Sequence, residues 1–550
     1  MRRFRPPAVL VFVLAGAPLV APPAVAASSG SGAPPLSAAH ARYVVLGQAA
    51  DGPTVALARL ILDPGFGCPS IVPAGAAGGG GGDGGASGSA PPIQMTPRDN
   101  PYHFPVIVCE APVGFDRELA IAMDGGSLSL PVVRRDPRRI AVFGDTGCKL
   151  GAAAAGESCP AGTPAQPFAG LAAAAAAGKP DLVIHLGDYN YRGTPSKVLF
   201  TERDGTAAQQ VGQWTYDAGD GTEEPEECVQ AAGAGFYSQS APNAGFPDGW
   251  EAWNDDLFSA APDLLAAAPW VVARGNHELC SKAGPGWFYF LDPHSDLVPG
   301  GRQYSCPPPD PAKAPIDNVV LSPPYAVGLG SLTLLVVDSA NACDSFTEKT
   351  FTAAYARQLA ALGGLAPAAG TAWWVSHRPL WGVTGFESGE STGCTADDRY
   401  GCNNQTLQAA LGRGLGGALP PAVELVLAGH MHRFQAVTFE PGDAGVGARP
   451  PVVVVGTGGV ALDPSPPVGA FAATVGGLPA QVLTTGAEVG TPSGEKAAFG
   501  YLDVAFGGAS GSWRGRLVDP AEGLTIATCG PPGEDGRGPV CALAPGIVVE

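Results

Sequence analysis

Short, largely apolar runs that end in polar residues recur along the middle of this chain. The runs lie at residues 140–143, 182–186, 270–273, 332–337, 373–375 and 425–428. Runs of this length are typical of buried strands. Alanine-rich segments between them predict helices at residues 166–178, 351–363 and 405–415. The alternation of strand, polar loop and helix predicts a layered α/β fold, in which ligands gather beyond the strand ends.

Further strands are predicted on both sides of this pattern. They lie at residues 43–46, 55–62, 104–109 and 127–133 before it, and at 452–456, 498–505 and 512–518 after it. We therefore predict a small N-terminal β-rich module over residues 27–137 and a catalytic domain over residues 138–520. A Gly/Ser-rich insertion near residues 75–92 is expected to be disordered. Residues 521–550 are predicted to form a C-terminal tail with a disulfide.

Residues 1–26 have the features of a secretory signal peptide. Arg2, Arg3 and Arg5 precede a short apolar segment, and the sequence Ala24-Val25-Ala26 resembles a cleavage site. No later stretch reaches the roughly 20 uninterrupted apolar residues that a membrane-spanning helix needs. We expect a secreted protein, periplasmic or extracellular, without a membrane span.

The cysteines and the net charge narrow the classes of function. None of the 12 cysteines forms a CxxC or CxxH pair, which favours disulfides over a thiolate zinc site. Local pairing, with the last pair left by elimination, predicts the bonds Cys68–Cys109, Cys148–Cys159, Cys280–Cys306, Cys394–Cys402, Cys529–Cys541 and Cys228–Cys343. The net charge of −19 argues against binding nucleic acid. It does not argue against a small phosphate ester, because bound metal ions would dominate the local field.

Five polar motifs follow the predicted strands, and they contain four of the 8 histidines. They are Gly144-Asp145-Thr146-Gly147, Gly187-Asp188-Tyr189-Asn190-Tyr191, Gly275-Asn276-His277-Glu278, Val375-Ser376-His377-Arg378-Pro379 and Gly429-His430-Met431-His432. Residues i and i+2 of an extended segment share a face, so His430 and His432 can point into one site. Carboxylate, phenol, amide and imidazole groups are ligands for hard and borderline metal ions. The motifs therefore predict a site for two adjacent metal ions.

Taken together, these motifs resemble those of the calcineurin-like metallophosphoesterases. Asp188 and Tyr191 have the Gly-Asp-x-x-Tyr spacing of the purple acid phosphatases, the closest group by motif set. One motif departs from that group, which usually has a valine three positions before the histidine, whereas Val375 lies two positions before His377. The resemblance implies an αββα fold, that is, a layered β-sandwich flanked by helices.

The resemblance also implies a role for each residue. Two adjacent metal sites are expected, and Asp188 bridges them. The first consists of Asp145, Asp188, Tyr191 and His432, and the second of Asp188, Asn276, His377 and His430. A phenolate ligand favours Fe(III) in the first site, and the second suits Zn, Mn or Fe(II).

His277 is expected to act as the general acid. The expected substrate contacts are Arg378, Asn276 and His277; for Arg378 the alternative is an exposed surface ion pair. Glu278 is expected either to orient His277 or to cap the following segment.

The function predicted from this site is hydrolysis of phosphate monoesters by in-line attack of a metal-bound hydroxide. A phosphodiesterase or nucleotidase with the same metal centre is an alternative. A catalytically inactive surface-binding protein with this fold is an alternative of another class. A small phosphate ester is the expected partner, and the sequence does not indicate an oligomeric state.

Overall fold

The computed structural model describes residues 33–49, 52–75, 91–102, 104–148, 167–191, 249–280, 282–306, 320–344, 347, 349–384, 401–440, 449–462, 469–486, 489–490, 499–507, 512–532 and 538–549. The predicted signal peptide and most of the Gly/Ser-rich insertion lie outside these residues.

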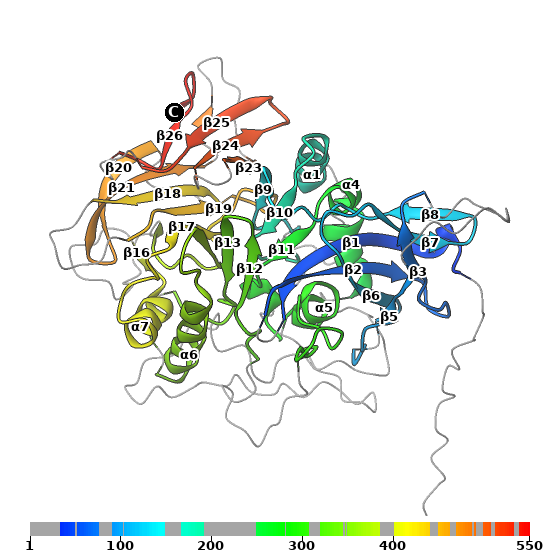
Figure 1. Cartoon of the computed structure of the whole chain (residues 1–550). Helices are drawn as coiled ribbons and strands as arrows, with labels where there is room; N and C mark the ends of the chain where they lie inside the picture. The colour runs from blue at the N-terminus through cyan, green and yellow to red at the C-terminus, as the bar shows by residue number, and fades with distance from the viewer. Residues whose placement is uncertain are drawn as a thin grey trace, which may run out of the picture.

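Two large sheets form the centre of the protein (Figure 1). The first has eleven strands in the order β26-β25-β24-β23-β9-β10-β11-β1-β2-β6-β5. In chain order these are β1 (Ala39–Gln48), β2 (Thr54–Leu62), β5 (Thr96–Pro97), β6 (Ile107–Val113), β9 (Arg139–Phe143), β10 (Leu182–His185), β11 (Trp270–Val272), β23 (Tyr501–Phe506), β24 (Trp513–Asp519), β25 (Leu524–Cys529) and β26 (Cys541–Leu543).

The second sheet has eight strands in the order β12-β13-β14-β17-β19-β18-β21-β20. They are β12 (Tyr325–Leu329), β13 (Leu332–Val336), β14 (Thr371–Val375), β17 (Val423–Ala428), β18 (Phe434–Phe439), β19 (Val452–Val455), β20 (Gly469–Val475) and β21 (Leu478–Thr485). Smaller sheets contain β3 (Ser70–Pro73), β4 (Ile93–Gln94), β7 (Leu119–Met123) and β8 (Gly126–Ser129), and the pairs β15 (Gly382–Thr384) with β16 (Gly401–Asn403) and β22 (Val489–Gly490) with β27 (Val548–Val549).

The helices flank the two large sheets. They are α1 (Phe168–Ala177), α3 (Trp250–Trp253), α4 (Pro262–Ala267), α5 (Gly284–Gly286), α6 (Lys349–Leu365) and α7 (Gln405–Gly414), with the 3-10 turns η1 (Leu36–Ala38) and η4 (Asn276–Glu278) and the π-helical turns η3 (Asn254–Phe258) and η5 (Trp287–Leu291). Asn404 precedes helix α7, and its side chain accepts a hydrogen bond from the backbone N–H of Leu407 and so caps the helix. In the part of the chain that the structure describes, no helix is both long and apolar enough to span a membrane.

Alternate residues of the central strands face different layers. Val142 and Ile184 of the first sheet belong to the same core as Trp373 and Leu427 of the second. Their chain neighbours point outward. Val183 packs in a cluster with residues of α1 and α4, and residues of β14 and β17 pack with α6 and α7. This arrangement of helix, sheet, sheet and helix confirms the predicted layered α/β fold.

Parallel pairing in each sheet explains where the functional residues can meet. Strands β9, β10 and β11 are parallel neighbours, and β13, β14, β17 and β19 are parallel in the second sheet. The carboxyl ends of parallel strands lie at one edge of a sheet. Strand β9 also pairs in antiparallel fashion with β23, where Val142 lies opposite Leu502.

The predicted N-terminal module is joined to the first sheet. Strand β1 pairs in parallel with β11, with Val45 opposite Trp270, and β2, β6 and β5 continue the sheet beyond it. At the other edge, β25 and β26 come from the predicted C-terminal tail. The predicted boundaries near residues 137 and 520 thus fall within one sheet, and the division into domains stays a prediction.

Prolines shift two of the predicted strands. The strand expected at residues 104–109 begins only at Ile107, after Pro105. The strand expected at 127–133 ends at Ser129, two residues before Pro131. Proline has no backbone N–H to donate to a strand neighbour, so it disfavours pairing wherever that donor is needed.

Three predicted disulfides are confirmed: Cys68–Cys109, Cys280–Cys306 and Cys529–Cys541. Cys148 and Cys343 are also disulfide-bonded, but their predicted partners, Cys159 and Cys228, lie outside the described residues. So does Cys394, the predicted partner of Cys402.

Candidate metal centre

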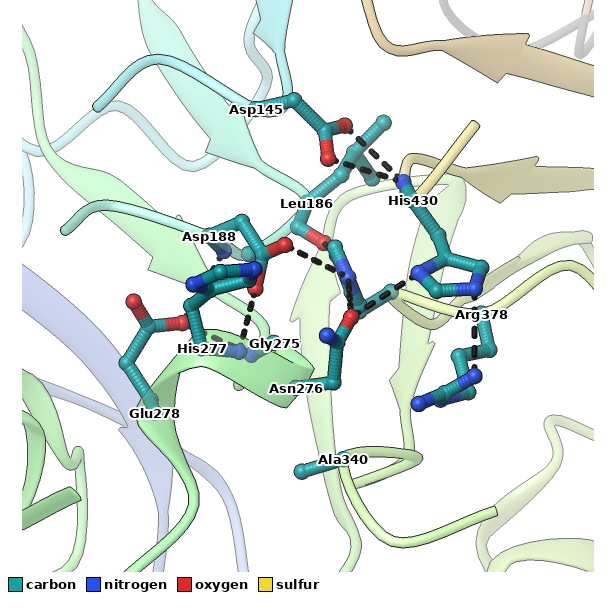
Figure 2. Close-up of polar contacts among 12 residues, drawn as sticks. Asp145, Leu186, Asp188, Gly275, Asn276, His277, Glu278, Ala340, Arg378 and His430 are labelled. Carbon is teal, nitrogen blue, oxygen red and sulfur yellow. Dashed lines mark hydrogen bonds and ion pairs between the residues drawn. The ribbon is translucent and has the colours of Figure 1, made fainter. Parts of the chain in front are cut away.

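The predicted ligands follow the central strands of both sheets. Asp145 follows β9, Asp188 follows β10 and Asn276 follows β11. His377 follows β14 and His430 follows β17, from the second sheet. Figure 2 shows the side chains of Asp145, Asp188, Asn276 and His430 pointing toward a common centre. The strand ends of the two sheets therefore assemble one site.

Three of these residues have an uncommon backbone conformation. Asp145, Asp188 and His430 have φ angles of 59°, 59° and 74°, in the left-handed region that residues other than glycine rarely adopt. Such conformations cost about 1–3 kcal/mol each and cluster at functional sites. Gly187 makes the close packing at the site feasible, because a Cβ there would lie 2.7 Å from Nδ1 of His377.

One group of ligand atoms contains Asp145, Asp188 and His432, all within 4.8 Å of one another. Tyr191 lies among them: its hydroxyl oxygen lies 2.8 Å from Oδ1 of Asp145 and from Oδ2 of Asp188, and 3.1 Å from Nε2 of His432. Burial, followed by the two carboxylates, raises the pKa of Tyr191 well above its ordinary value. A phenolate would therefore need a cation beside it.

A second group contains Asp188, His377 and His430. Asn276 joins it, because its Oδ1 lies 2.9 Å from Nε2 of His377 and 2.8 Å from Nδ1 of His430. Nε2 of His377 also lies 3.3 Å from Oδ2 of Asp188. Asp188 thus belongs to both groups.

A hydrogen bond on the side of the His377 ring that faces away from Asn276 determines which ring nitrogen carries the proton. Its Nδ1 lies 2.9 Å from the carbonyl oxygen of Leu186, which can only accept. Nδ1 therefore carries the proton, and Nε2 presents a lone pair to Oδ1 of Asn276, which is itself an acceptor. Burial lowers the pKa of His377 despite the attraction of Asp188, which favours the neutral ring. Two acceptors that face each other at 2.9 Å fit a bound cation.

Glu278 connects the loops that carry these ligands. It is fully buried, and its carboxylate accepts hydrogen bonds from the backbone N–H groups of Asp188 at 2.9 Å, Tyr189 at 2.8 Å and Gly275 at 3.0 Å. Burial, and then the charge of Asp188, raise its pKa to about 8. The hydrogen bond from Gly275 caps the turn η4, which contains Glu278, and not the segment that follows it. Glu278 also fixes the position of the Asp188 loop, which the sequence did not indicate.

His277 lies at the edge of the first group. Its ring centre is 4.1 Å from that of Tyr191, and its backbone N–H donates to Oδ1 of Asp188 at 2.8 Å. Its Nδ1 is buried and has no hydrogen-bond partner within the described residues. Burial lowers the pKa of His277 well below its ordinary value, against the attraction of Asp188.

Arg378 is fully buried, so the alternative of an exposed surface pair is wrong. Its Nη1 bonds to Oδ2 of Asp344 and lies 3.1 Å from Nε2 of His430. Nδ1, the other ring nitrogen of His430, faces Asn276. Figure 2 shows Arg378 beside His430, away from Asp145 and Asp188. The predicted contact between Arg378 and phosphate stays a prediction.

Asp344 is a residue of this site that the sequence analysis missed. Its Oδ2 lies 2.6 Å from Nε2 of His430, and its Oδ1 accepts from Nδ2 of Asn404 at 2.8 Å. Burial would raise its pKa, but Arg378 and His430 hold that pKa well below its ordinary value. Asp344 lies in no motif, and its only signal is that its loop follows the predicted strand at 332–337.

A comparison with protein families decides the class of protein. The family model described as calcineurin-like phosphoesterase matches residues 138–434, more than half of the 550 residues. The chain belongs to the calcineurin-like phosphoesterase family. It is therefore a metal-dependent phosphoesterase, a hydrolase, as the motifs predicted. All seven predicted ligand residues lie within the matched range.

Other comparisons are more distant. No curated protein matches the chain. Among solved structures, purple acid phosphatase PPD1 from yellow lupin (Lupinus luteus) seeds is similar with 13% identity and a TM-score of 0.45, covering 88% of this chain and 72% of that one. A structure of PhoD is similar with 11% identity and a TM-score of 0.40, covering 88% of this chain and 89% of that one. Neither similarity is close enough to assign a substrate.

Proposed function

We propose that this calcineurin-like phosphoesterase is a phosphomonoesterase with a binuclear metal centre. The observation that carries the proposal is the convergence of lone pairs around Asn276 and Asp188. Asn276 Oδ1 has an imidazole nitrogen on each side, at 2.9 and 2.8 Å. Asp188 belongs to both groups of ligand atoms, which suits a carboxylate that bridges two ions.

The donor sets suggest which ions would bind. The group with Asp145, Asp188 and His432 includes the phenol of Tyr191, a ligand that suits Fe(III). The group with His377, His430 and Asn276 has the mixed nitrogen and oxygen donors that suit Zn, Mn or Fe(II). Bound ions would acidify a water molecule for attack on phosphorus and neutralise charge on the phosphoryl oxygens.

In this proposal residues of the protein hold the loops that carry the metal ligands and transfer a proton to the substrate. Glu278 holds the loops of Asp188 and Asn276 together through backbone hydrogen bonds. His277 donates a proton to the leaving oxygen. Burial lowers the pKa of its imidazole, and we expect an anionic phosphate ester bound beside it to favour the protonated ring.

A substrate comparison tests the proposed reaction. Protein loaded with iron and zinc is expected to hydrolyse p-nitrophenyl phosphate with a higher kcat/KM than bis-p-nitrophenyl phosphate. A clear preference for the diester would replace the monoesterase with the phosphodiesterase alternative. Loaded protein that hydrolyses neither ester would support the inactive binding protein.

The colour of the protein tests the iron site. A tyrosinate bound to Fe(III) is expected to give a visible absorption band, which Tyr191→Phe should abolish. Tyr189→Phe is the matched control, because Tyr189 is equally buried but its hydroxyl bonds to the carbonyl oxygen of Ala273 at 3.1 Å. A colourless, active zinc enzyme would disprove the iron assignment and leave the phosphoesterase in place.

We also propose that the protein is exported. The predicted signal peptide at residues 1–26 and the disulfide bonds support this proposal. N-terminal sequencing of the exported protein is expected to begin at Ala27, and retention of residues 1–26 on a cytoplasmic protein would contradict it.

A further inference from the structure

The carboxylate of Asp344 contacts the proposed metal ligand His430 on the side of its ring that faces away from Asn276. Oδ2 of Asp344 lies 2.6 Å from Nε2 of His430, and the Asp344 side chain is 19% exposed. On the other side of the same ring, Nδ1 of His430 lies 2.8 Å from Oδ1 of Asn276. His430 is therefore held between Asp344 and the proposed second metal site.

This contact determines which nitrogen of His430 can bind a metal. An ionised carboxylate can only accept hydrogen bonds, and its contact with Nε2 of His430 at 2.6 Å is shorter than the 3.1 Å contact of Arg378 Nη1 with the same nitrogen. The shorter contact places the proton on Nε2 and leaves the lone pair on Nδ1. For His377 the acceptor is instead the carbonyl oxygen of Leu186, which binds Nδ1 and leaves Nε2 free. The two imidazoles thus offer different nitrogens because different acceptors orient them.

Two neighbours fix the Asp344 carboxylate in turn. Arg378, which is fully buried, bonds to Oδ2. Asn404 donates from Nδ2 to Oδ1 of Asp344 and to the carbonyl oxygen of Ala342, both at 2.8 Å. Because Asn404 also caps α7 through Leu407, the carboxylate is anchored to a helix start as well as to the end of β14.

We propose that Asp344 is a positioning residue for the second metal site. It sets the tautomer and the ring orientation of His430, and Arg378 serves to hold Asp344 rather than to bind the substrate. The inference rests on the proposed binuclear centre. Partners of this kind behind a metal ligand typically change metal affinity by about 10- to 100-fold when they are removed.

Zinc titration of the iron-loaded protein tests this role without measuring activity. Wild type is expected to bind one Zn²⁺ per chain in the second site. Asp344→Ala should bind it about 10- to 100-fold more weakly. Asp344→Asn keeps an acceptor for Nε2–H but loses the charge, so a smaller loss is expected. If Asp344→Ala does not fold, the zinc affinity of Asp344→Asn tests the role of Asp344.

Asp338→Ala is the matched control. Asp338 is a buried carboxylate of the same loop, and it accepts from Nη1 of Arg274 at 3.0 Å and from the backbone N–H of Ser322 at 2.7 Å. It bonds to no proposed ligand in the described residues. We expect this variant to lower the melting temperature while its zinc affinity stays that of wild type.

The outcomes separate this inference from the function on which it rests. Wild-type protein that takes up no zinc would overturn the binuclear centre itself. Wild type that binds zinc with the same affinity as Asp344→Ala would overturn only the role of Asp344. Equal losses of zinc affinity in Asp344→Ala and Asp338→Ala would show a general effect of destabilisation, which also overturns it.

Discussion

Two buried polar clusters in this protein differ in the groups that compensate their buried charges. The first, here called the ion-pair cluster, consists of Arg59, Arg98 and Glu110. Oε2 of Glu110 accepts hydrogen bonds at 2.7 Å from both arginines. The remaining guanidinium N–H groups donate to backbone carbonyls between Phe288 and His294. Two arginines share one carboxylate, and backbone carbonyls accept their other hydrogen bonds, so the partners in this cluster come from the protein itself.

The second, here called the metal cluster, consists of the seven predicted ligands Asp145, Asp188, Tyr191, Asn276, His377, His430 and His432. It contains two carboxylates and no lysine or arginine. Buried charges without compensation cost several kcal/mol each, and the metal ions proposed above would stabilise these carboxylates. The comparison separates the two clusters by their partners: the charged groups of the first bond to one another and to backbone carbonyls, whereas the carboxylates of the second lie among the oxygen and nitrogen donors of the proposed metal site.

The strongest test of this contrast is Asp188→Asn. Because Asp188 belongs to both groups of ligand atoms, the variant is expected to lose the second ion and about 5 kcal/mol or more of transition-state stabilisation. That corresponds to a loss of about five-thousandfold or more in kcat/KM. Metal content and hydrolysis of p-nitrophenyl phosphate measure both effects. A variant with full metal content and activity would refute the idea that the metal cluster needs this carboxylate.

His277→Gln is expected to have the next largest effect and to separate proton transfer from metal binding. Removal of a general acid typically lowers the rate by about 10² to 10⁴. Metal content should not change, because His277 is not among the seven ligands. The measurement is kcat together with metal analysis. If the rate falls only in proportion to lost metal, His277 supports the site rather than donating a proton.

Glu110→Gln tests the ion-pair cluster. Removing one partner of a buried ion pair is expected to lower the free energy of unfolding by about 3–5 kcal/mol, while metal content and kcat of the folded protein remain those of wild type. Asp503→Asn is the control, since the arginines that pair with Asp503 are 42% and 56% exposed and such pairs are worth about 0–1 kcal/mol. Loss of metal in Glu110→Gln would contradict the expectation that the ion-pair cluster contributes to stability and not to metal binding.

The smallest expected effect is a pH dependence of stability. Burial would raise the pKa of Glu110, but the nearby arginines and Ser295 outweigh it and hold the pKa below its ordinary value of 4.5. A lowered pKa stabilises the folded state above pH 4.5, and this contribution is lost as the pH falls through the pKa of the folded protein. Melting temperatures measured from pH 7 to pH 3 should therefore fall more steeply in wild type than in Glu110→Gln. Parallel curves would contradict this assignment.

The strand ends were predictable because their signal is local. A short apolar run followed by Asp145, Asp188 or His430 marks a buried strand and its polar end within a few residues. The structure brings all seven predicted ligands together in one site, from two sheets. The layered fold was predictable for the same reason, since its layers follow from the alternation of strands and helices.

Other features depend on partners far away in the chain. Asp344 has no motif, and only its contact with His430 reveals a role. Arg378 is buried beside Asp344 and His430, and its sequence neighbours did not indicate this burial. The pairing of β1 with β11 joins Val45 to Trp270, and no local pattern could indicate that the N-terminal strands extend the catalytic sheet.

The pairing of β9 with β23 has a consequence for how the protein is made. The strand that leads into Asp145 obtains this neighbour from Leu502, some 360 residues later in the chain. Contacts between such distant segments form slowly, because a long loop must close first. Until β23 has been synthesised, this edge of β9 is unpaired and can join the edge of another chain. We therefore expect chains truncated before residue 501 to aggregate and metal to load only onto the nearly complete polypeptide.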